Sequence, residues 1–242
     1  MIKVIIISGY GFNCEEETRF AFHLASKDIE IDIIHINDLI SQPNLLSSYQ
    51  IMCIPGGFSY GDHTGSGNAF ACYLQHHLMD AISTFRQQDK LIMGICNGCQ
   101  VLVRLFPEEF PVDLHTNVSG TYQCEWVDLI TEKNNSIWCK DIKSMHIPIA
   151  HGEGRFVVHD DQSINIAWQY QQNPNGSDLN IAALESMDGK ILAMMPHPER
   201  AVLFSQHDQW TFLKEKYKRQ GQSPPIYADG IHIFRNAIAY FQ

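Results

Sequence analysis

The chain has 242 residues, which is long enough for one α/β domain with a sizeable buried core. Hydrophobic residues make up 45% of it and charged residues 18%, as in an ordinary globular protein. The formal net charge of −10 argues against nucleic acid or an anionic membrane surface as the main partner.

Cysteine usage and the N-terminal sequence indicate the compartment. The seven cysteines are an odd number and lie among apolar positions such as Cys53 and Cys72. This usage predicts a reduced, cytoplasmic protein without a disulfide framework. Residues 1–8 are too short for the apolar region of a signal peptide and are predicted to be a strand. Since no apolar run approaches the length of a membrane span, we expect no membrane partner.

Apolar strand-like runs alternate with helical patterns in the first part of the chain. Strands are predicted at 2–8, 29–36, 51–54 and 91–95. Helices are predicted at 15–26, 68–86 and 100–106, the last of them stopped by Pro107. Strands separated by helices indicate βαβ units, and therefore a three-layer α/β fold with a mostly parallel central sheet.

Shorter apolar pieces follow Pro107 and are predicted to be strands that join or flank the same sheet. They lie at 122–130, 145–150, 155–158, 164–168, 181–184 and 191–194. An amphipathic helix is predicted at 229–241, and segment 204–225 is interpreted as a solvated helix face followed by a loop. No repeat or linker marks a second domain, so one domain is expected over 1–242.

The segment Gly94-Ile95-Cys96-Asn97-Gly98 has the pattern of a nucleophile elbow, with cysteine as the nucleophile. It follows a strand that reads as buried on both faces and precedes a helix, so its glycines would permit a tight strand-to-helix turn. The turn would place Cys96 at a helix N-terminus, where the dipole favours a thiolate. The alternative is a buried structural cysteine.

A base for this nucleophile is predicted in Pro196-His197-Pro198-Glu199, directly after an apolar strand. In an α/β sheet the carboxyl ends of the strands meet at one edge, so His197 can face Cys96. In extended chain the i, i+2 spacing would put Glu199 on the same side as His197, where it could orient the imidazole. The alternative is a loop histidine with a surface glutamate.

A glycine-rich turn, Pro55-Gly56-Gly57-Phe58, follows the strand at 51–54. Glycines leave backbone N–H groups open to a developing oxyanion. The N–H groups of Gly57 and Asn97 are the predicted donor pair. A plain strand-to-helix turn is the alternative.

The sequence also contains two partial motifs for other kinds of site. Gly9-Tyr10-Gly11 is half of a dinucleotide fingerprint, but Cys14 stands where the third glycine would be. Cys96 and Cys99 form a C-x-x-C, which suggests a thioredoxin-like redox pair or half of a zinc site. There is no second such pair and no HExxH, and the twelve histidines show no ligand-like spacing. No metal site, dinucleotide site or P-loop is therefore predicted.

Taken together, these motifs resemble those of the class I (triad) glutamine amidotransferases. Within them the sequence is similar to the glutaminase subunit or domain of the phosphoribosylformylglycinamidine synthases, and the similarity covers nearly the whole chain. The motifs that carry it are PGGFSYGD at 55–62, GICNGCQ at 94–100, IPIAHGEGRF at 147–156, NPNGS at 173–177 and MMPHPERAV at 194–202. His63-Thr64-Gly65 stands where the separate subunits usually have Tyr-Leu-Arg. Together with NPNGS and HGEGR, this difference favours the large single-chain form.

The resemblance implies a flavodoxin-like fold and glutamine hydrolysis by a triad of Cys96, His197 and Glu199. It also implies that the ammonia passes to a synthetase that converts formylglycinamide ribonucleotide to its amidine. That partner, with or without a small accessory subunit, would bind the ATP and Mg²⁺, and this chain would need no cofactor. The predicted glutamine-binding and oxyanion residues are Gly56, Gly57, Phe58, Asn97, Gln100, His151, Gly152 and Glu153.

Two alternatives to this function stay open at the level of the sequence. One is a related α/β cysteine hydrolase that acts on another amide. The other is an inactive regulatory or assembly subunit, against which the presence of all three triad residues argues.

Overall fold

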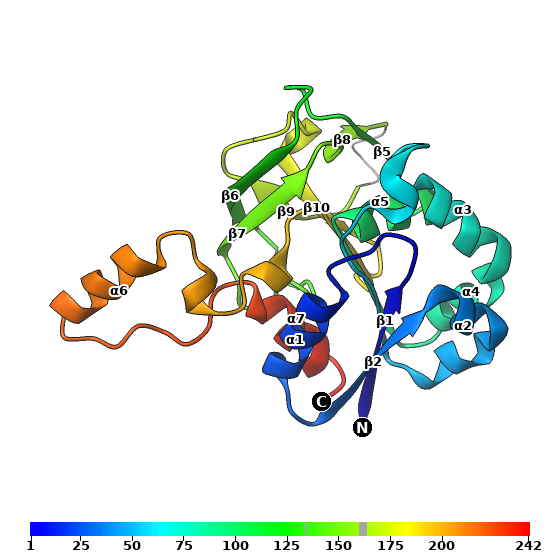
Figure 1. Cartoon of the computed structure of the whole chain (residues 1–242), viewed down its shortest axis with the longest axis horizontal. Coiled ribbons are helices and arrows are strands. Elements are labelled where there is room, and N and C mark those ends of the chain that lie inside the picture. The colour runs from blue at the N-terminus through cyan, green and yellow to red at the C-terminus, as the bar shows by residue number, and fades with distance from the viewer. Residues whose placement is uncertain (134, 160–163) are drawn as a thin grey trace.

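A computed structural model describes residues 1–133, 135–159 and 164–242 of the chain (Figure 1). Its centre is a nine-stranded sheet with the order β2-β1-β3-β4-β11-β10-β9-β6-β7. The parallel part consists of β2 (Ile29–His35), β1 (Ile2–Ser8), β3 (Ile51–Ile54), β4 (Leu91–Ile95) and β11 (Ile191–Met194). The antiparallel part consists of β10 (Ile181–Glu185), β9 (Ile166–Tyr170), β6 (Gln123–Ile130) and β7 (Ser144–His151).

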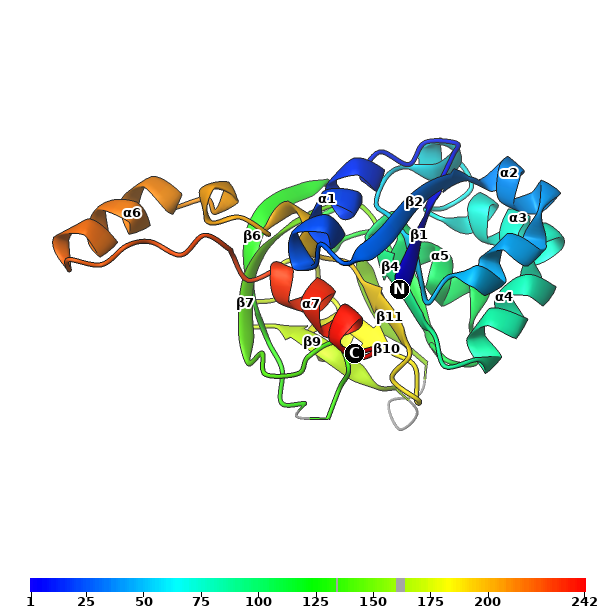
Figure 2. The ribbon, with the colours of Figure 1, turned by 90° about the horizontal axis from the view of Figure 1, so that it is seen from below.

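Helices cover both faces of the sheet, which gives the predicted three layers (Figure 2). On one face α1 (Glu15–Ala25) packs against α7 (Ile231–Ala239). The other face is covered by α3 (Asn68–His77), α4 (Met79–Gln87) and α5 (Asn97–Leu105), while α2 (Ile36–Ser41) follows the edge strand β2. A separate two-stranded sheet pairs β5 (Val112–His115) with β8 (Arg155–Val158). These observations confirm the predicted α/β fold with a mostly parallel sheet.

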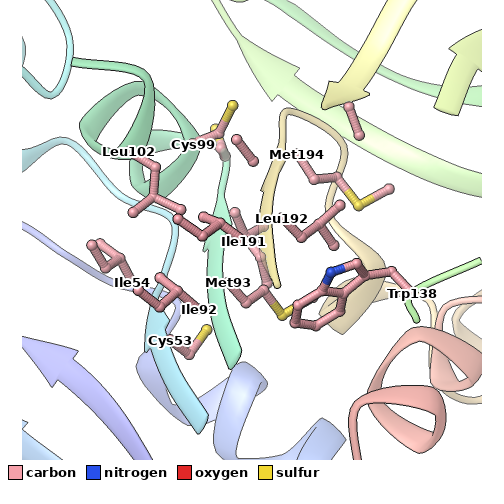
Figure 3. Close-up of a cluster of buried hydrophobic side chains, with 14 of the residues drawn as sticks. Cys53, Ile54, Ile92, Met93, Cys99, Leu102, Trp138, Ile191, Leu192 and Met194 are labelled. Atoms are coloured by element: carbon pink, nitrogen blue, oxygen red, sulfur yellow. The ribbon is translucent and has the colours of Figure 1, made fainter. Parts of the chain in front are cut away.

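The core lies where β3, β4 and β11 run side by side, because every residue of these strands is buried. On one side of the sheet the indole of Trp138 lies beside Met93 and Leu192 (Figure 3). Trp138 is fully buried, and its Nε1 donates a hydrogen bond of 2.9 Å to the carbonyl of Gly189. Leu102 of α5 packs on the opposite side.

The prediction of one continuous helix at 68–86 was wrong. The chain leaves the helical conformation at Leu78 (φ −131°, ψ 2°), which separates α3 from α4. Leu74, Leu78 and Ile82 are all buried, so the apolar spacing continues through the break and conceals it. Helix α5 begins at Asn97, earlier than predicted, and the elements α2 and β5 were not predicted.

Helix α6 (Trp210–Arg219) extends away from the rest of the molecule at the end of a long excursion (Figures 1 and 2). None of its residues is buried, and Phe212 is 65% exposed. This agrees with the solvated helix and loop predicted for 204–225. Among the described residues, no helix combines the length and apolar character needed to cross a membrane.

The contrast between the core and this helix can be tested with two tryptophans. Trp138→Ala removes a fully buried indole and should lower the free energy of unfolding by about 3–5 kcal/mol. Trp210→Ala is the matched control, since its side chain is 37% exposed, and it should cost less than about 1 kcal/mol. Urea unfolding followed by circular dichroism measures both, and equal losses would contradict this assignment of the core.

Candidate active site

Cys96 sits on a sharp turn between β4 and α5. Its φ of 51° lies in the left-handed region, which costs a non-glycine residue about 1–3 kcal/mol. The flanking glycines are required by close contacts. A Cβ at Gly98 would lie 1.9 Å from the carbonyl oxygen of Ile54, and one at Gly94 would lie 2.5 Å from that of Gly98. The turn therefore has the geometry of a nucleophile elbow, with a strained backbone at the cysteine.

His197 reaches Cys96 because β11 and β4 are parallel neighbours whose ends coincide. Met194 pairs with Ile95, and the N–H of Cys96 donates a 2.7 Å hydrogen bond to the carbonyl of Met194. The chain then turns so that the backbone N–H of His197 donates to the carbonyl of Pro148 on β7 at 2.8 Å. The histidine is thereby fixed between the two halves of the sheet.

Glu199 lies against the imidazole, with its Oε1 at 2.5 Å from His197 Nδ1. Both side chains are buried. The extended chain expected here was wrong, because Pro198–Arg200 is a turn of 3₁₀ helix. The two side chains meet through this turn and not through the alternation of a strand.

The electrostatics of the histidine follow from this burial. Burial by itself lowers the pKa of His197, but the charges of Glu199 and Cys96 outweigh that effect and raise the pKa well above its usual value. His197 is thus suited to carry a positive charge beside Cys96. At the same time the N-terminus of α5 favours negative charge at Cys96.

Cys14 also belongs to this site, although the sequence did not predict it as a site residue. It is fully buried, and its Sγ accepts a hydrogen bond of 2.9 Å from Arg200 Nη2. Its Sγ, a ring nitrogen of His197 and a carboxylate oxygen of Glu199 all lie within 4.8 Å of one another. The available signal was its place in Asn13-Cys14-Glu15, where a strand-turn-helix unit reaches the same sheet edge.

The two predicted oxyanion glycines make close approaches to this site. A Cβ at Gly56 would lie 2.9 Å from His197 Cε1, and one at Gly57 would lie 2.5 Å from the Cα of Phe12. Among the described residues, the backbone N–H of Gly57 donates no hydrogen bond. The N–H of Asn97, in the first turn of α5, has no acceptor within its helix. Both predicted donors are therefore available to an incoming oxygen.

The side chain of Asn97 fastens the glycine turn to the elbow. Its Oδ1 accepts a 3.0 Å hydrogen bond from the N–H of Ser59, and its Nδ2 donates to Gln100 Oε1 at 2.8 Å. Phe58 lies on the same turn with its ring 46% exposed, and its own N–H is already bonded to the carbonyl of Gly11. Phe58 can therefore offer a ring to a substrate, but not a backbone donor.

The predicted glutamine-binding loop at 151–153 is linked to the elbow helix. Gln100 Nε2 donates to the backbone carbonyl of Glu153, while Gly152 accepts from the N–H of Asn117 at 2.9 Å. The Glu153 carboxylate accepts from Ser66 Oγ at 3.2 Å and forms an ion pair with Arg104 at 3.1 Å. The Gln100 amide and the Glu153 carboxylate therefore already have protein partners in this structure. These contacts hold the 151–153 loop in place.

His151 has one ring nitrogen, Nε2, that is buried and has no hydrogen-bond partner among the described residues. Its Nδ1 lies 3.1 Å from Asn117 Oδ1, and the amide of Asn117 donates to the carbonyls of Thr121 and His151. Asn117 Oδ1 is therefore an acceptor, so the His151 proton is on Nδ1 and Nε2 is a bare acceptor. Burial, followed by the nearby charge of His197, lowers the pKa of His151 to about 4, and the ring is neutral near pH 7.

Comparison with known proteins shows the family of this chain. Residues 1–241 match the model of the CobB/CobQ-like glutamine amidotransferase domain. The phosphoribosylformylglycinamidine synthase subunit PurQ of Methanococcus maripaludis strain C7 is 38% identical over 99% of this chain and 97% of that protein. The chain belongs to the PurQ family of glutamine amidotransferases. The solved structure of PurLQS from Thermotoga maritima contains a chain that is 30% identical, with a TM-score of 0.78 over 100% of this chain and 99% of that one.

The family also has a long form, represented by the phosphoribosylformylglycinamidine synthase of Drosophila melanogaster. That enzyme is 31% identical over 92% of this chain, and the match spans 19% of its length. The separate archaeal subunit is the more similar of the two at 38%. The expectation drawn from His63-Thr64-Gly65, that the sequence leans towards the long form, is not supported by these identities.

The charge on His197 can be tested by replacing its partner. Glu199→Gln keeps the shape of the side chain but removes its negative charge, so the pKa of His197 should fall. Nitrogen chemical shifts of the imidazoles across a pH titration measure it. In the unmodified chain His197 should stay protonated at a pH where an ordinary histidine is neutral, and His151 should be neutral in the same spectra as an internal control. An unchanged His197 titration in the variant would contradict the proposed electrostatics.

Proposed function

We propose that this chain is the glutaminase subunit of a phosphoribosylformylglycinamidine synthase. It hydrolyses glutamine to glutamate and ammonia, and a partner synthetase uses the ammonia to convert formylglycinamide ribonucleotide to the amidine in purine synthesis. The observation that carries this proposal is that the elbow cysteine, Cys96, lies beside His197. The Nδ1 of this histidine is in turn 2.5 Å from Glu199 Oε1. The 38% identity to a PurQ subunit supports the choice of substrate and pathway.

The first half of the reaction forms a thioester. Cys96 Sγ attacks the side-chain carbonyl carbon of glutamine, and the proton from the thiol resides on His197. The carbonyl oxygen becomes an oxyanion, which the N–H groups of Gly57 and Asn97 can stabilise. His197 then gives its proton to the departing nitrogen, the C–N bond breaks and ammonia leaves.

The second half regenerates the cysteine. His197, now neutral, takes a proton from water, and the resulting hydroxide attacks the thioester carbon. The C–S bond breaks as the tetrahedral intermediate collapses, so glutamate leaves and the thiolate returns. Throughout, Glu199 holds the Nδ1 side of the ring and stabilises the imidazolium each time it forms.

This chemistry needs no cofactor on this chain, because the thiolate and the imidazole supply both the nucleophile and the acid–base group. We assign ATP and Mg²⁺ to the synthetase, whose reaction activates the ribonucleotide amide. The seven cysteines are free, which supports a reducing, cytoplasmic compartment. Burial, and then the neighbouring Cys96, raise the pKa of Cys99 well above its usual value, so Cys99 is assigned a packing role.

Cysteine variants separate this mechanism from the C-x-x-C alternative. Cys96→Ala should lower glutamine-dependent synthesis on the order of 10⁶-fold, as removal of a triad nucleophile does. Synthesis from added ammonia should survive, because the synthetase is intact. Cys99→Ser is the matched control and should keep most of the activity, since that thiol is fully buried. An essential Cys99 with a dispensable Cys96 would instead support a redox function.

The partner should raise glutaminase activity, since ammonia released without an acceptor is lost. The contact available for this is the glycine turn, whose Phe58 and Tyr60 donate to the carbonyls of Gly11 and Tyr10. Tyr10 is 42% exposed, so a bound protein could shift this turn and with it the Gly57 donor. We expect glutamate release to rise at least about tenfold, or 1.4 kcal/mol in barrier, when synthetase, ribonucleotide and an ATP analogue are added. Full activity of the isolated chain, unchanged by these additions, would favour a free-standing hydrolase.

A further inference from the structure

A second cluster of imidazole and carboxylate groups lies outside the triad and consists of His146, His207 and Asp208. It is at the start of the excursion that carries α6 away from the rest of the molecule (Figure 1). His146 is on β7, and His207 and Asp208 follow the short 3₁₀ helix Phe204–Gln206. The indole of Trp126 on β6 stacks with both imidazoles, with ring centroids 5.2 and 5.4 Å apart. The cluster therefore joins the edge of the sheet to the start of the excursion.

Electron-pair donors converge within this cluster. Asp208 Oδ1 lies 3.2 Å from His146 Nε2 and 2.8 Å from His207 Nδ1. His207 Nδ1 also accepts a hydrogen bond from the backbone N–H of Gln209 at 3.0 Å, so it carries no proton in that bond. Two acceptors 2.8 Å apart repel each other unless a cation or a proton lies between them. The ligand atoms of His146, His207 and Asp208 all lie within 4.8 Å of one another.

A further carboxylate is placed as metal sites require. Asp128 Oδ1 lies 2.8 Å from Nδ1 of His146, the nitrogen that points away from Asp208. A histidine that binds a metal through one nitrogen almost always donates its other N–H to a carboxylate or carbonyl, which fixes the ring and its tautomer. Asp128 therefore occupies Nδ1 of His146 and leaves Nε2, on the side of Asp208, as the nitrogen that can bind an ion.

We propose that His146, His207 and Asp208 form a site for a divalent transition-metal ion of the Zn²⁺ class. Two imidazoles and a carboxylate are ligands that Zn²⁺ accepts, and water would take the remaining position. Ligation replaces the Gln209 hydrogen bond at His207. The role of the ion is structural: it fastens the start of the 204–225 excursion to β7. The bridge between Leu203 and Tyr227 joins the outgoing and returning arms of the excursion at the same place.

This site could not be predicted from the sequence, and no metal site was expected. His146 and Asp208 are 62 residues apart in the chain, so no ligand spacing is visible. The competing explanation of the same contacts is a protonated His146 held between the carboxylates of Asp128 and Asp208 without any ion. The two explanations differ in what zinc does to the protein.

Zinc titration of the full chain by calorimetry tests the site. The reference protein carries Cys14→Ala and Cys96→Ala, because Cys14, His197 and Glu199 also offer ligand atoms within 4.8 Å of one another. We expect one Zn²⁺ per chain. His146→Gln and His207→Gln should each weaken binding at least about tenfold, and Asp128→Asn about 10- to 100-fold. His76→Gln with His77→Gln is the matched control, an imidazole pair with ring centroids 4.6 Å apart on α3, and should leave binding unchanged.

Hydrogen exchange gives a second readout that does not depend on activity. Zinc should slow exchange in residues 203–209 of the reference protein and leave it unchanged in the His207→Gln variant. Absence of zinc binding by the reference protein, or binding that the histidine variants do not weaken, would overturn the proposal. Either result would leave an imidazolium–carboxylate cluster without metal.

Discussion

The parallel pairing of β4 with β11 is the constraint on which the site depends. It brings the carboxyl ends of two strands that are far apart in the sequence to the same level, with Met194 opposite Ile95. The hydrogen bond from Cys96 N to Met194 O then fixes the first residue beyond β4 against the last residue of β11. Every residue of both strands is buried, so neither can slip without moving the core.

Buried charges at the site are stable only because His197 and Glu199 are paired with each other. Taking an imidazolium and a carboxylate out of water costs several kcal/mol per ion, and a close contact offsets this only with good geometry. The 2.5 Å contact between His197 and Glu199 supplies that geometry. Since the folded-state pKa of His197 lies above its unfolded value, the resulting stabilisation is full at low pH and is lost as the pH rises through the folded pKa. The same contact therefore stabilises the fold and keeps His197 charged beside Cys96.

The sequence was sufficient to predict those site residues that lie in short local motifs. Cys96 was found because the glycines around it are forced by contacts under 3 Å, which leave a fixed local signature. The His197–Glu199 pairing was anticipated, but its 3₁₀ turn was not, because two prolines suit an extended chain equally well. The break at Leu78 was hidden by unbroken apolar spacing, and Cys14 and His146 were missed because their partners are distant in the sequence.

Burial in the core excludes two of the other thiols, Cys53 and Cys99, from the role of nucleophile. Burial, and then the charge of Glu199, raise the pKa of Cys53, while burial and then the charge of Cys96 raise that of Cys99, so both thiols stay protonated inside the core. Cys96 keeps 6% exposure and stands at the start of α5. Cys96 is itself buried among core residues, but the turn that strains its backbone sets it at the end of β4, beside His197. Cys53 lies within β3 and Cys99 within α5, so their thiols stay enclosed by the core, and of these three cysteines only the turn residue meets the imidazole.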